Sequence, residues 1–223
     1  QVGPNGETLI EFSINQALKA GIKKIIFIVG EKTEKPFKEK FGNKYKNIRV
    51  EYAFQKYDHE KRDKPWGTTD ALCSAKELIN CPFIVCNGDD IYGEEPFCIL
   101  TKHLQENTAG ATIGYKLDKV IPKDGLVNRG IFQIENSEVT KIKEIFNISK
   151  QNITEKNLSD KSLTSMNLFA LHPEDIKNLN KILEKFKLEN SKDRKIECLL
   201  PEDLQKLIHE KKLILKLYST ESK

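Results

Sequence analysis

The chain has 223 residues, of which 31% are charged and 38% hydrophobic, and its formal net charge is +4. This composition suits a soluble globular protein with a sizeable core, and no apolar stretch approaches the roughly 18 residues that span a bilayer. The weak and scattered positive charge argues against nucleic acid as a partner. Five cysteines without a Cys-x-x-Cys pair, in a sequence without a secretion signal, indicate reduced thiols and a cytoplasmic location.

Helices and strands alternate through the first half of the chain. Apolar residues at helical spacing predict a helix over 8–20, and Gly21 is placed to end it. The same reading predicts strands over 23–29, 48–55, 83–87 and 109–117, and helices over 34–41, 68–79 and 95–106. Such alternation is typical of a mainly parallel sheet covered on both faces.

The second half of the chain follows a different pattern. Two apolar-rich segments, 130–135 and 139–146, flank a polar turn and predict a hairpin, and a polar loop over 147–161 follows. Beyond it the sequence predicts strands over 165–171 and 213–218 and helices over 173–188 and 202–211.

An apolar run over 83–86 ends abruptly in Asn87, Gly88, Asp89 and Asp90. These turn-forming residues place two carboxylates at the carboxyl end of a predicted strand, where open α/β sheets bind their ligands. Mg²⁺ commonly takes one or two carboxylates together with substrate phosphates. Asp89 and Asp90 are therefore predicted to form a metal–nucleotide site, and a solvated loop is the alternative interpretation.

Several separated segments carry a resemblance to a known family. They are Gln55 at a strand end, Lys64-Pro-Trp-Gly-Thr-Thr-Asp-Ala71 before a helix, Asn87-Gly-Asp-Asp90 after a strand, and Ser165-Met-Asn167 late in the chain. In this order they resemble the sugar-phosphate nucleotidyltransferases, or NDP-sugar pyrophosphorylases, over nearly the whole chain. The resemblance implies an α/β, Rossmann-like three-layer fold with a mainly parallel central sheet and a β-hairpin extension on the acceptor side. One domain over 1–223 is expected, with a nucleotide-binding half at about 1–117 and an acceptor-binding half at about 118–223.

The resemblance implies a reaction in which a nucleoside triphosphate is joined to a phosphorylated sugar or small alcohol with release of pyrophosphate. Asp89 would act in catalysis and hold Mg²⁺, and Asp90 is either a second ligand or a turn residue. Glu144 would lie near the acceptor sugar in a catalytic role, or be a solvent-facing charge.

The remaining site residues also follow from the resemblance. Gln55, Gly67, Thr68 and Gly88 match nucleotide-binding positions, and Asn167, Gly114 and Gly130 match acceptor-binding positions in relatives. Gln55 is otherwise an ordinary strand-end residue. Gly67 would allow close backbone approach to the nucleotide, Thr68 would cap the helix that follows, and Trp66 is interpreted as packing the loop.

The sequence departs from the family at its most diagnostic feature. Relatives carry an opening strand and a glycine-rich loop whose backbone amides cradle the triphosphate, whereas this chain opens at Gln1-Val2-Gly3-Pro4, which matches the stretch after that loop. Relatives also continue beyond the strand near Leu217. The expectation is a fragment of a longer protein, unstable or inactive by itself.

Three alternative functions stay open at this point. A glycosyltransferase of related fold would also hold a metal after a strand, although such sites usually read Asp-x-Asp. A cytidylyltransferase acting on phosphocholine-like alcohols and a non-catalytic nucleotide-binding domain are the others. The base, the acceptor and the oligomeric state cannot be read from the sequence.

Overall fold

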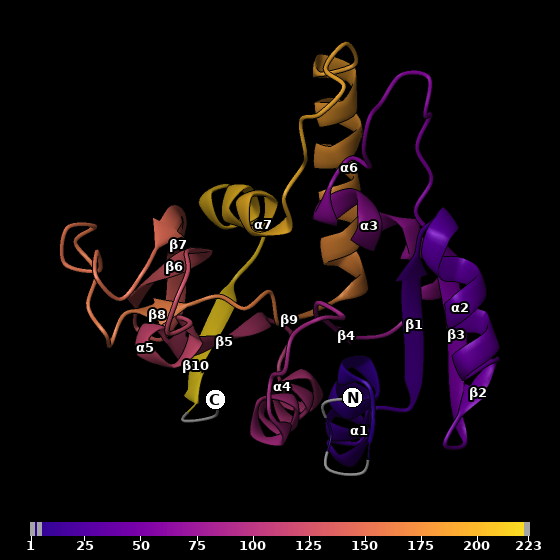
Figure 1. Cartoon of the computed structure of the whole chain (residues 1–223), viewed down its shortest axis with the longest axis horizontal. Coiled ribbons are helices and arrows are strands. Elements are labelled where there is room, and N and C mark those ends of the chain that lie inside the picture. The colour runs from indigo at the N-terminus through magenta and orange to yellow at the C-terminus, as the bar shows by residue number, and fades with distance from the viewer. Residues whose placement is uncertain (1–2, 4–5, 221–223) are drawn as a thin grey trace. The chain divides into compact units, whose positions relative to one another are not determined.

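The computed structural model describes residue 3 and residues 6–220, and the chain divides into two compact units (Figure 1). Unit 1 consists of residues 1–21, 83–171 and 208–223, and unit 2 of residues 22–82 and 172–207. Each unit therefore combines segments from both the first and the second half of the chain. Residues 1, 2, 4 and 5, which belong to the opening stretch matched above, lie outside the described residues.

Unit 2 contains a three-stranded sheet in the order β1-β3-β2. β1 (Lys24–Val29) and β3 (Ile48–Phe54) are parallel, and α2 (Glu31–Phe41) connects them and contacts both. The short β2 (Lys44–Tyr45) pairs antiparallel with β3. The alternating strand pattern of the sequence thus produces one β-α-β unit, as predicted.

The helices of unit 2 include those that follow the Pro-Trp-Gly-Thr segment. α3 (Thr68–Ser74) continues into a 3₁₀ helix, η1 (Lys76–Leu78), and contacts α6 (Pro173–Glu189), as Figure 1 shows. Pro173 occupies the first turn of α6, where its missing N–H has no helical partner to lose. α7 (Leu200–His209) lies almost wholly in this unit.

Unit 1 contains a seven-stranded sheet in the order β10-β7-β6-β8-β5-β9-β4, with a further pairing between β10 and β5. Its strands are β4 (Phe83–Val85), β5 (Gly110–Lys116), β6 (Val127–Glu135), β7 (Glu138–Ile148), β8 (Leu163–Thr164), β9 (Phe169–Leu171) and β10 (Leu215–Thr220). The helices are α1 (Leu9–Lys19), α4 (Glu94–Glu106) and the short α5 (Leu117–Val120), and α1 contacts α4.

The core of unit 1 forms between α4 and the centre of the sheet. Tyr92, Leu100, Ile113 and Leu168 are each fully buried there. The Tyr115 hydroxyl donates to the Tyr92 carbonyl at 3.0 Å and ties the turn after β4 to β5. This contact fixes the segment that carries the two predicted metal ligands.

Strand direction is where the architecture departs from a mainly parallel sheet. Only β1–β3 and β10–β5 pair in parallel among the described strands. β9 inserts antiparallel between β4 and β5, and β6, β7 and β8 also pair antiparallel with their neighbours. β4 and β5 still run in the same direction on either side of β9. The insertion is a long-range pairing, which no local pattern in the sequence encodes.

Three local predictions are also corrected. Residues 165–168 are not in a strand, and Asn167 takes a left-handed φ of 57° between β8 and β9. α3 is shorter than the predicted helix over 68–79, because η1 replaces its last turn. The hairpin is confirmed, although β6 begins earlier than predicted and β7 is longer at both ends.

Candidate functional site

The predicted site residues divide between the two units. Gln55, Gly67 and Thr68 belong to unit 2. Unit 1 holds the others, which are Gly88, Asp89, Asp90, Gly114, Gly130, Glu144 and Asn167. The geometry of each group is described within its own unit.

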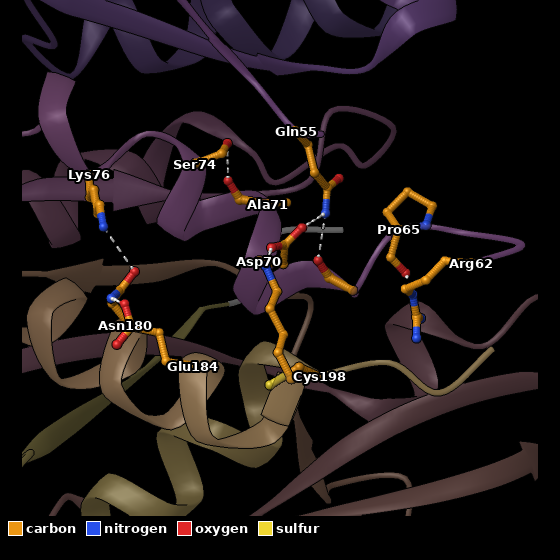
Figure 2. Close-up of polar contacts among 12 residues, drawn as sticks. Gln55, Arg62, Pro65, Asp70, Ala71, Ser74, Lys76, Asn180, Glu184 and Cys198 are labelled. Carbon is orange, nitrogen blue, oxygen red and sulfur yellow. Dashed lines mark hydrogen bonds and ion pairs between the residues drawn. The ribbon is translucent and has the colours of Figure 1, made fainter. Parts of the chain in front are cut away.

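Gln55, predicted as the last residue of a strand, lies directly after the end of β3, and its backbone N–H donates to the Val29 carbonyl at 2.9 Å. Its side-chain Nε2 donates to the Gly67 carbonyl at 3.0 Å and to Asp70 Oδ2 at 2.8 Å (Figure 2). Both amide hydrogens are therefore used within the chain. The side-chain oxygen Oε1 has no hydrogen-bond partner in the part of the chain that the structure describes, and it is the atom available to a ligand.

Gly67 is required by the protein's own packing. Its φ of +104° is one that residues with a Cβ rarely adopt, and a Cβ there would lie 2.5 Å from the Cys198 carbonyl oxygen. The Cys198 N–H donates to the Trp66 carbonyl at 2.7 Å, and the Thr69 N–H donates back to the Cys198 carbonyl at 3.1 Å. The close approach that Gly67 permits in this structure is that of the Cys198 backbone.

Thr68 is not the N-cap that the sequence predicted. Gly67 occupies the N-cap position of α3, and Thr68 is the first helical residue. Its hydroxyl instead accepts a 2.8 Å hydrogen bond from the N–H of Leu200, the first residue of α7. Thr68 therefore satisfies an N–H group at the start of a second helix, far along the chain.

The loop before Gly67 is held by a buried guanidinium that sequence reasoning missed. Arg62 is only 2% exposed, and it donates to the carbonyls of Lys64 at 3.1 Å, Asp193 at 2.7 Å and Ile196 at 2.5 Å. It also stacks 3.5 Å from the centre of the Trp66 ring. The interpretation of Trp66 as a loop-packing residue is confirmed by this contact.

Sequence reasoning also missed the buried carboxylate of Asp203, which lies on α7 and contacts α3. The buried Asp203 carboxylate accepts from the Thr69 hydroxyl at 2.6 Å and from the Cys198 thiol at 2.8 Å, and it pairs with Lys206 at 2.7 Å. Burial and the hydrogen bond to Asp203 raise the pKa of the Cys198 thiol above its usual range. The thiol thus remains a neutral donor, and this network joins α3 to α7.

In unit 1, the two adjacent aspartates of the turn after β4 have different environments. The Asp90 carboxylate accepts from Asn87 Nδ2 at 2.9 Å and from the Tyr92 hydroxyl at 3.4 Å, and its carbonyl accepts from the Ser13 hydroxyl at 2.7 Å. Asp89 is exposed, and its carboxylate has no partner in the described part of the chain. Asp90 thus stabilises the turn through Oδ2, whereas the exposed Asp89 carboxylate keeps both of its oxygens for a ligand.

Asp89 fits a hard cation as a single protein ligand. Among the described residues, no cluster of three or more histidine, cysteine, aspartate or glutamate side chains could hold a metal. Mg²⁺ is commonly bound by one or two carboxylates with substrate phosphates completing its shell, so one available carboxylate is compatible with such binding. Gly88 leaves space beside it, since an added Cβ would meet only Ile10 Cδ1, at an ordinary 3.6 Å.

The predicted acceptor-side residues lie partly together in unit 1. Gly130 pairs with Glu144 across β6 and β7, and a Cβ at Gly130 would come within 3.4 Å of Glu144 Oε2. The Gly130 carbonyl accepts from the Ser165 N–H at 2.8 Å, and the Ser165 hydroxyl accepts from the Asn167 N–H at 3.1 Å. The Asn167 side chain has no hydrogen bond within the described residues.

Gly114 does not belong to this group. It lies inside β5 and not in a loop, and a Cβ there would be 3.1 Å from both Leu163 Cβ and Leu217 Cδ2. Its small size serves strand packing. Gly130 likewise lies within β6, so both glycines lie in strands, as the sequence predicted.

Comparisons with known proteins agree with this architecture. A protein-family model described as nucleotidyl transferase matches residues 1–207. No curated protein sequence matches the chain. Among the described residues, no helix has the length and apolar character needed to cross a membrane.

Two solved structures are similar in fold. The first is a UDP-glucose pyrophosphorylase complexed with UDP-glucose, with 17% identity, a TM-score of 0.60, and coverage of 96% of this chain and 79% of that one. The second is a Bacillus anthracis protein assigned as a glucose-1-phosphate thymidylyltransferase, in complex with sucrose. It is 13% identical, with a TM-score of 0.66, and the match covers 96% of this chain and 74% of that one. These matches confirm the predicted α/β nucleotidyltransferase fold.

Proposed function

Because the chain belongs to the nucleotidyl transferase family, we propose that it transfers a nucleotidyl group from a nucleoside triphosphate to a phosphorylated sugar. The proposal rests on the position of Asp89 on the turn after β4. Its carboxylate is exposed and has no protein partner in the described part of the chain. The two similar structures support a sugar phosphate as acceptor, since their names specify UDP-glucose and glucose 1-phosphate chemistry.

In the proposed reaction, a phosphate oxygen of the acceptor attacks the α-phosphorus of the nucleotide. The bond from the α-phosphorus to the bridging oxygen breaks, and pyrophosphate leaves with the electron pair of that bond. No covalent intermediate is required, so the protein contributes mainly by positioning the two substrates and by stabilising charge.

The proposed roles follow the geometry of each unit. Asp89 would hold Mg²⁺, which when bound neutralises charge on the phosphates. Gln55 would face the base through its free Oε1, and Gly88 would allow the nucleotide close to the turn. Asn167 and Glu144 would contact the acceptor, and Asp90 holds the turn in place.

The experiment that tests the proposal measures pyrophosphate release by the protein from its complete reading frame. Mg²⁺, each of four NTPs, and pooled sugar phosphates with phosphocholine are supplied in turn. Release with a sugar phosphate supports the proposal, and its loss in Asp89→Ala supports the role of that carboxylate. Release only with CTP and phosphocholine would identify a cytidylyltransferase, and transfer from a nucleotide sugar without pyrophosphate would identify a glycosyltransferase.

A second proposal concerns the 223-residue chain by itself. Its sequence contains no glycine-rich loop of the type that cradles a triphosphate through backbone amides. We expect this chain alone to release no pyrophosphate under any of these conditions. Measurable release from the purified 223-residue chain would contradict the expectation, and nucleotide binding without release by the complete protein would favour a non-catalytic domain.

A further inference from the structure

Asp70, on the first turn of α3, has a buried carboxylate whose two oxygens contact different partners. Its residue is 6% exposed, Oδ2 accepts from Gln55 Nε2 at 2.8 Å, and Oδ1 pairs with the ammonium of Lys187 on α6. All three residues belong to unit 2. A carboxylate paired with an ammonium group has no proton to donate, so Asp70 can only accept from Gln55.

A second acceptor fixes the same amide. The Gly67 carbonyl oxygen lies 3.0 Å from Gln55 Nε2, so both hydrogens of the amide are directed at oxygens of the protein. Exchanging the positions of Nε2 and Oε1 would place Oε1 against a carbonyl and a carboxylate, which cannot donate to it. Figure 2 shows Gln55 with its nitrogen toward Asp70 and its oxygen directed away.

This arrangement restricts what Gln55 can offer a ligand. A free glutamine amide presents one acceptor and two donors, and can rotate to suit either kind of partner. Here only the acceptor Oε1 remains available, as no described residue donates to it. The side chain is therefore committed to ligands that donate a hydrogen bond at this point.

We propose that Asp70 is a positioning residue that orients the Gln55 amide and thereby selects nucleotides whose base donates an N–H to Oε1. The proposal rests on the proposed function, because it takes Gln55 to face the base. A site with an oriented hydrogen-bonding group rejects a base that cannot pair with it, since a buried polar group is then left without a partner.

An ordinary structural role for Asp70 makes a different prediction. An acidic residue in the first turn of a helix interacts favourably with the helix dipole, and the ion pair with Lys187 joins α3 to α6. Losing those contacts would weaken binding of every nucleotide by a similar factor. If Asp70 orients Gln55, its loss should instead change the differences in affinity among the nucleotides.

The test is Asp70→Asn in the protein from its complete reading frame. The new side chain can accept from Lys187 with its oxygen and then turns its NH₂ toward Gln55. Only the Gly67 carbonyl then still favours the present orientation of the amide, so the reversed amide with Nε2 facing outward becomes populated. Binding of ATP, CTP, GTP and UTP, each with Mg²⁺, is measured by titration calorimetry, together with KM and kcat for the preferred nucleotide. We expect the affinity for the preferred nucleotide to fall about tenfold, the differences among the four to shrink, and KM to change more than kcat.

Lys187→Gln is the matched control. It removes the ion pair but keeps the Asp70 carboxylate as an acceptor for Gln55, so we expect the order and spacing of the four affinities to be retained. The unfolding midpoints of both variants measure the stability that each loses with the ion pair between Asp70 and Lys187. A Lys187→Gln protein whose selectivity changes as that of Asp70→Asn does would overturn the proposal.

The failures of the two proposals are distinguishable. If the unsubstituted protein binds none of the four nucleotides, the proposed function fails, and this inference fails with it. If the unsubstituted protein binds and discriminates, but Asp70→Asn weakens binding of all four nucleotides by the same factor, so that the differences among them are kept, only the orienting role of Asp70 is overturned.

Discussion

Two groups of predicted site residues differ in how far the protein itself uses their polar atoms. Gln55, Gly67 and Thr68, the tethered group, each have a partner or a close neighbour elsewhere in unit 2. In the open group, which consists of Gly88, Asp89 and Asn167, the two polar side chains have no hydrogen-bond partner among the described residues, and a Cβ at Gly88 would meet no backbone. Substitutions of Gly67 and Thr68 should act through stability, and those in the second group through ligand binding, whereas Gln55 is held by the protein and also offers Oε1 to a ligand.

The largest expected effect is on catalysis and comes from the open group. Asp89→Asn should lower kcat/KM about 100-fold or more, because the charged ligand of the proposed Mg²⁺ is lost. The free energy of unfolding should change by less than about 0.5 kcal/mol, since the carboxylate is exposed and has no protein partner to lose. Pyrophosphate release and urea unfolding of the complete protein measure the two quantities.

Asp90→Ala is the matched comparison for that variant. It removes the acceptor for Asn87 and Tyr92 and should cost about 1 kcal/mol of stability, with a much smaller loss of activity. Equal activity losses in the two variants would show that the adjacent aspartates share one role, and the contrast between them would then be wrong.

The two glycines give the next effect, on stability. Gly67→Ala should destabilise unit 2 by about 3 kcal/mol, because a Cβ there meets the Cys198 backbone and φ is +104°. Gly88→Ala should leave stability within about 0.5 kcal/mol, as it meets only the tip of Ile10. Urea denaturation of both variants checks the difference, and an equally stable Gly67→Ala would show that the Cys198 backbone can move away.

A smaller effect is expected at Thr68. Thr68→Val keeps the shape of the side chain but removes the acceptor for the Leu200 N–H, and should cost about 1 kcal/mol. Thr68→Ser retains the hydroxyl and should stay close to the unsubstituted protein. Nucleotide affinity, measured by calorimetry, should be nearly unchanged in both variants, so a selective loss of affinity in Thr68→Val would move this residue into the open group.

The smallest effect concerns pH and lies at the start of α6. Burial raises the pKa of Asp175 above its usual 3.8, while the hydrogen bond from the His172 N–H, at 2.8 Å, opposes that shift. Because the folded state binds the Asp175 proton more tightly than the unfolded state does, protonation of Asp175 stabilises the fold. This contribution to the free energy of unfolding is complete below pH 3.8 and is lost as the pH rises through the folded pKa. Asp175→Asn keeps an oxygen to accept from His172 and removes the titration.

Urea unfolding of Asp175→Asn and of the unsubstituted protein between pH 4 and 7 tests the direction of this pH dependence. The stability of Asp175→Asn relative to the unsubstituted protein should rise as the pH increases over the lower part of that range. A difference that is constant across the range, or one that falls, would show that the carboxylate is better stabilised in the fold than its burial indicates.

Local elements could be predicted from the sequence because their causes are local. The Thr8 capping box with Glu11 begins α1, Pro173 begins α6, and the apolar period of 48–55 defines β3 within one residue. The predicted strand over 165–171 failed only at 165–168, where Asn167 takes a left-handed conformation before β9 begins. Sequence reasoning also missed the antiparallel insertion of β9, because pairing partners are chosen by contacts far apart in the chain.

Within the candidate site, residue types and their order were enough to point to Gln55, Asp89 and the Gly67–Thr68 pair, and to the nucleotidyl transferase family that the family match confirms. Asp70 lies in the segment 64–71, but nothing in the sequence marked it as a site residue. Arg62 and Asp203 could not be distinguished from the charged residues that are usual in loops and helices. Only the tertiary structure could separate Asp89 from Asp90, or show that Gly67 makes room for Cys198. The physical reason is that a hydrogen bond or close contact depends on distance in space, and these partners lie up to about 130 residues apart in the chain.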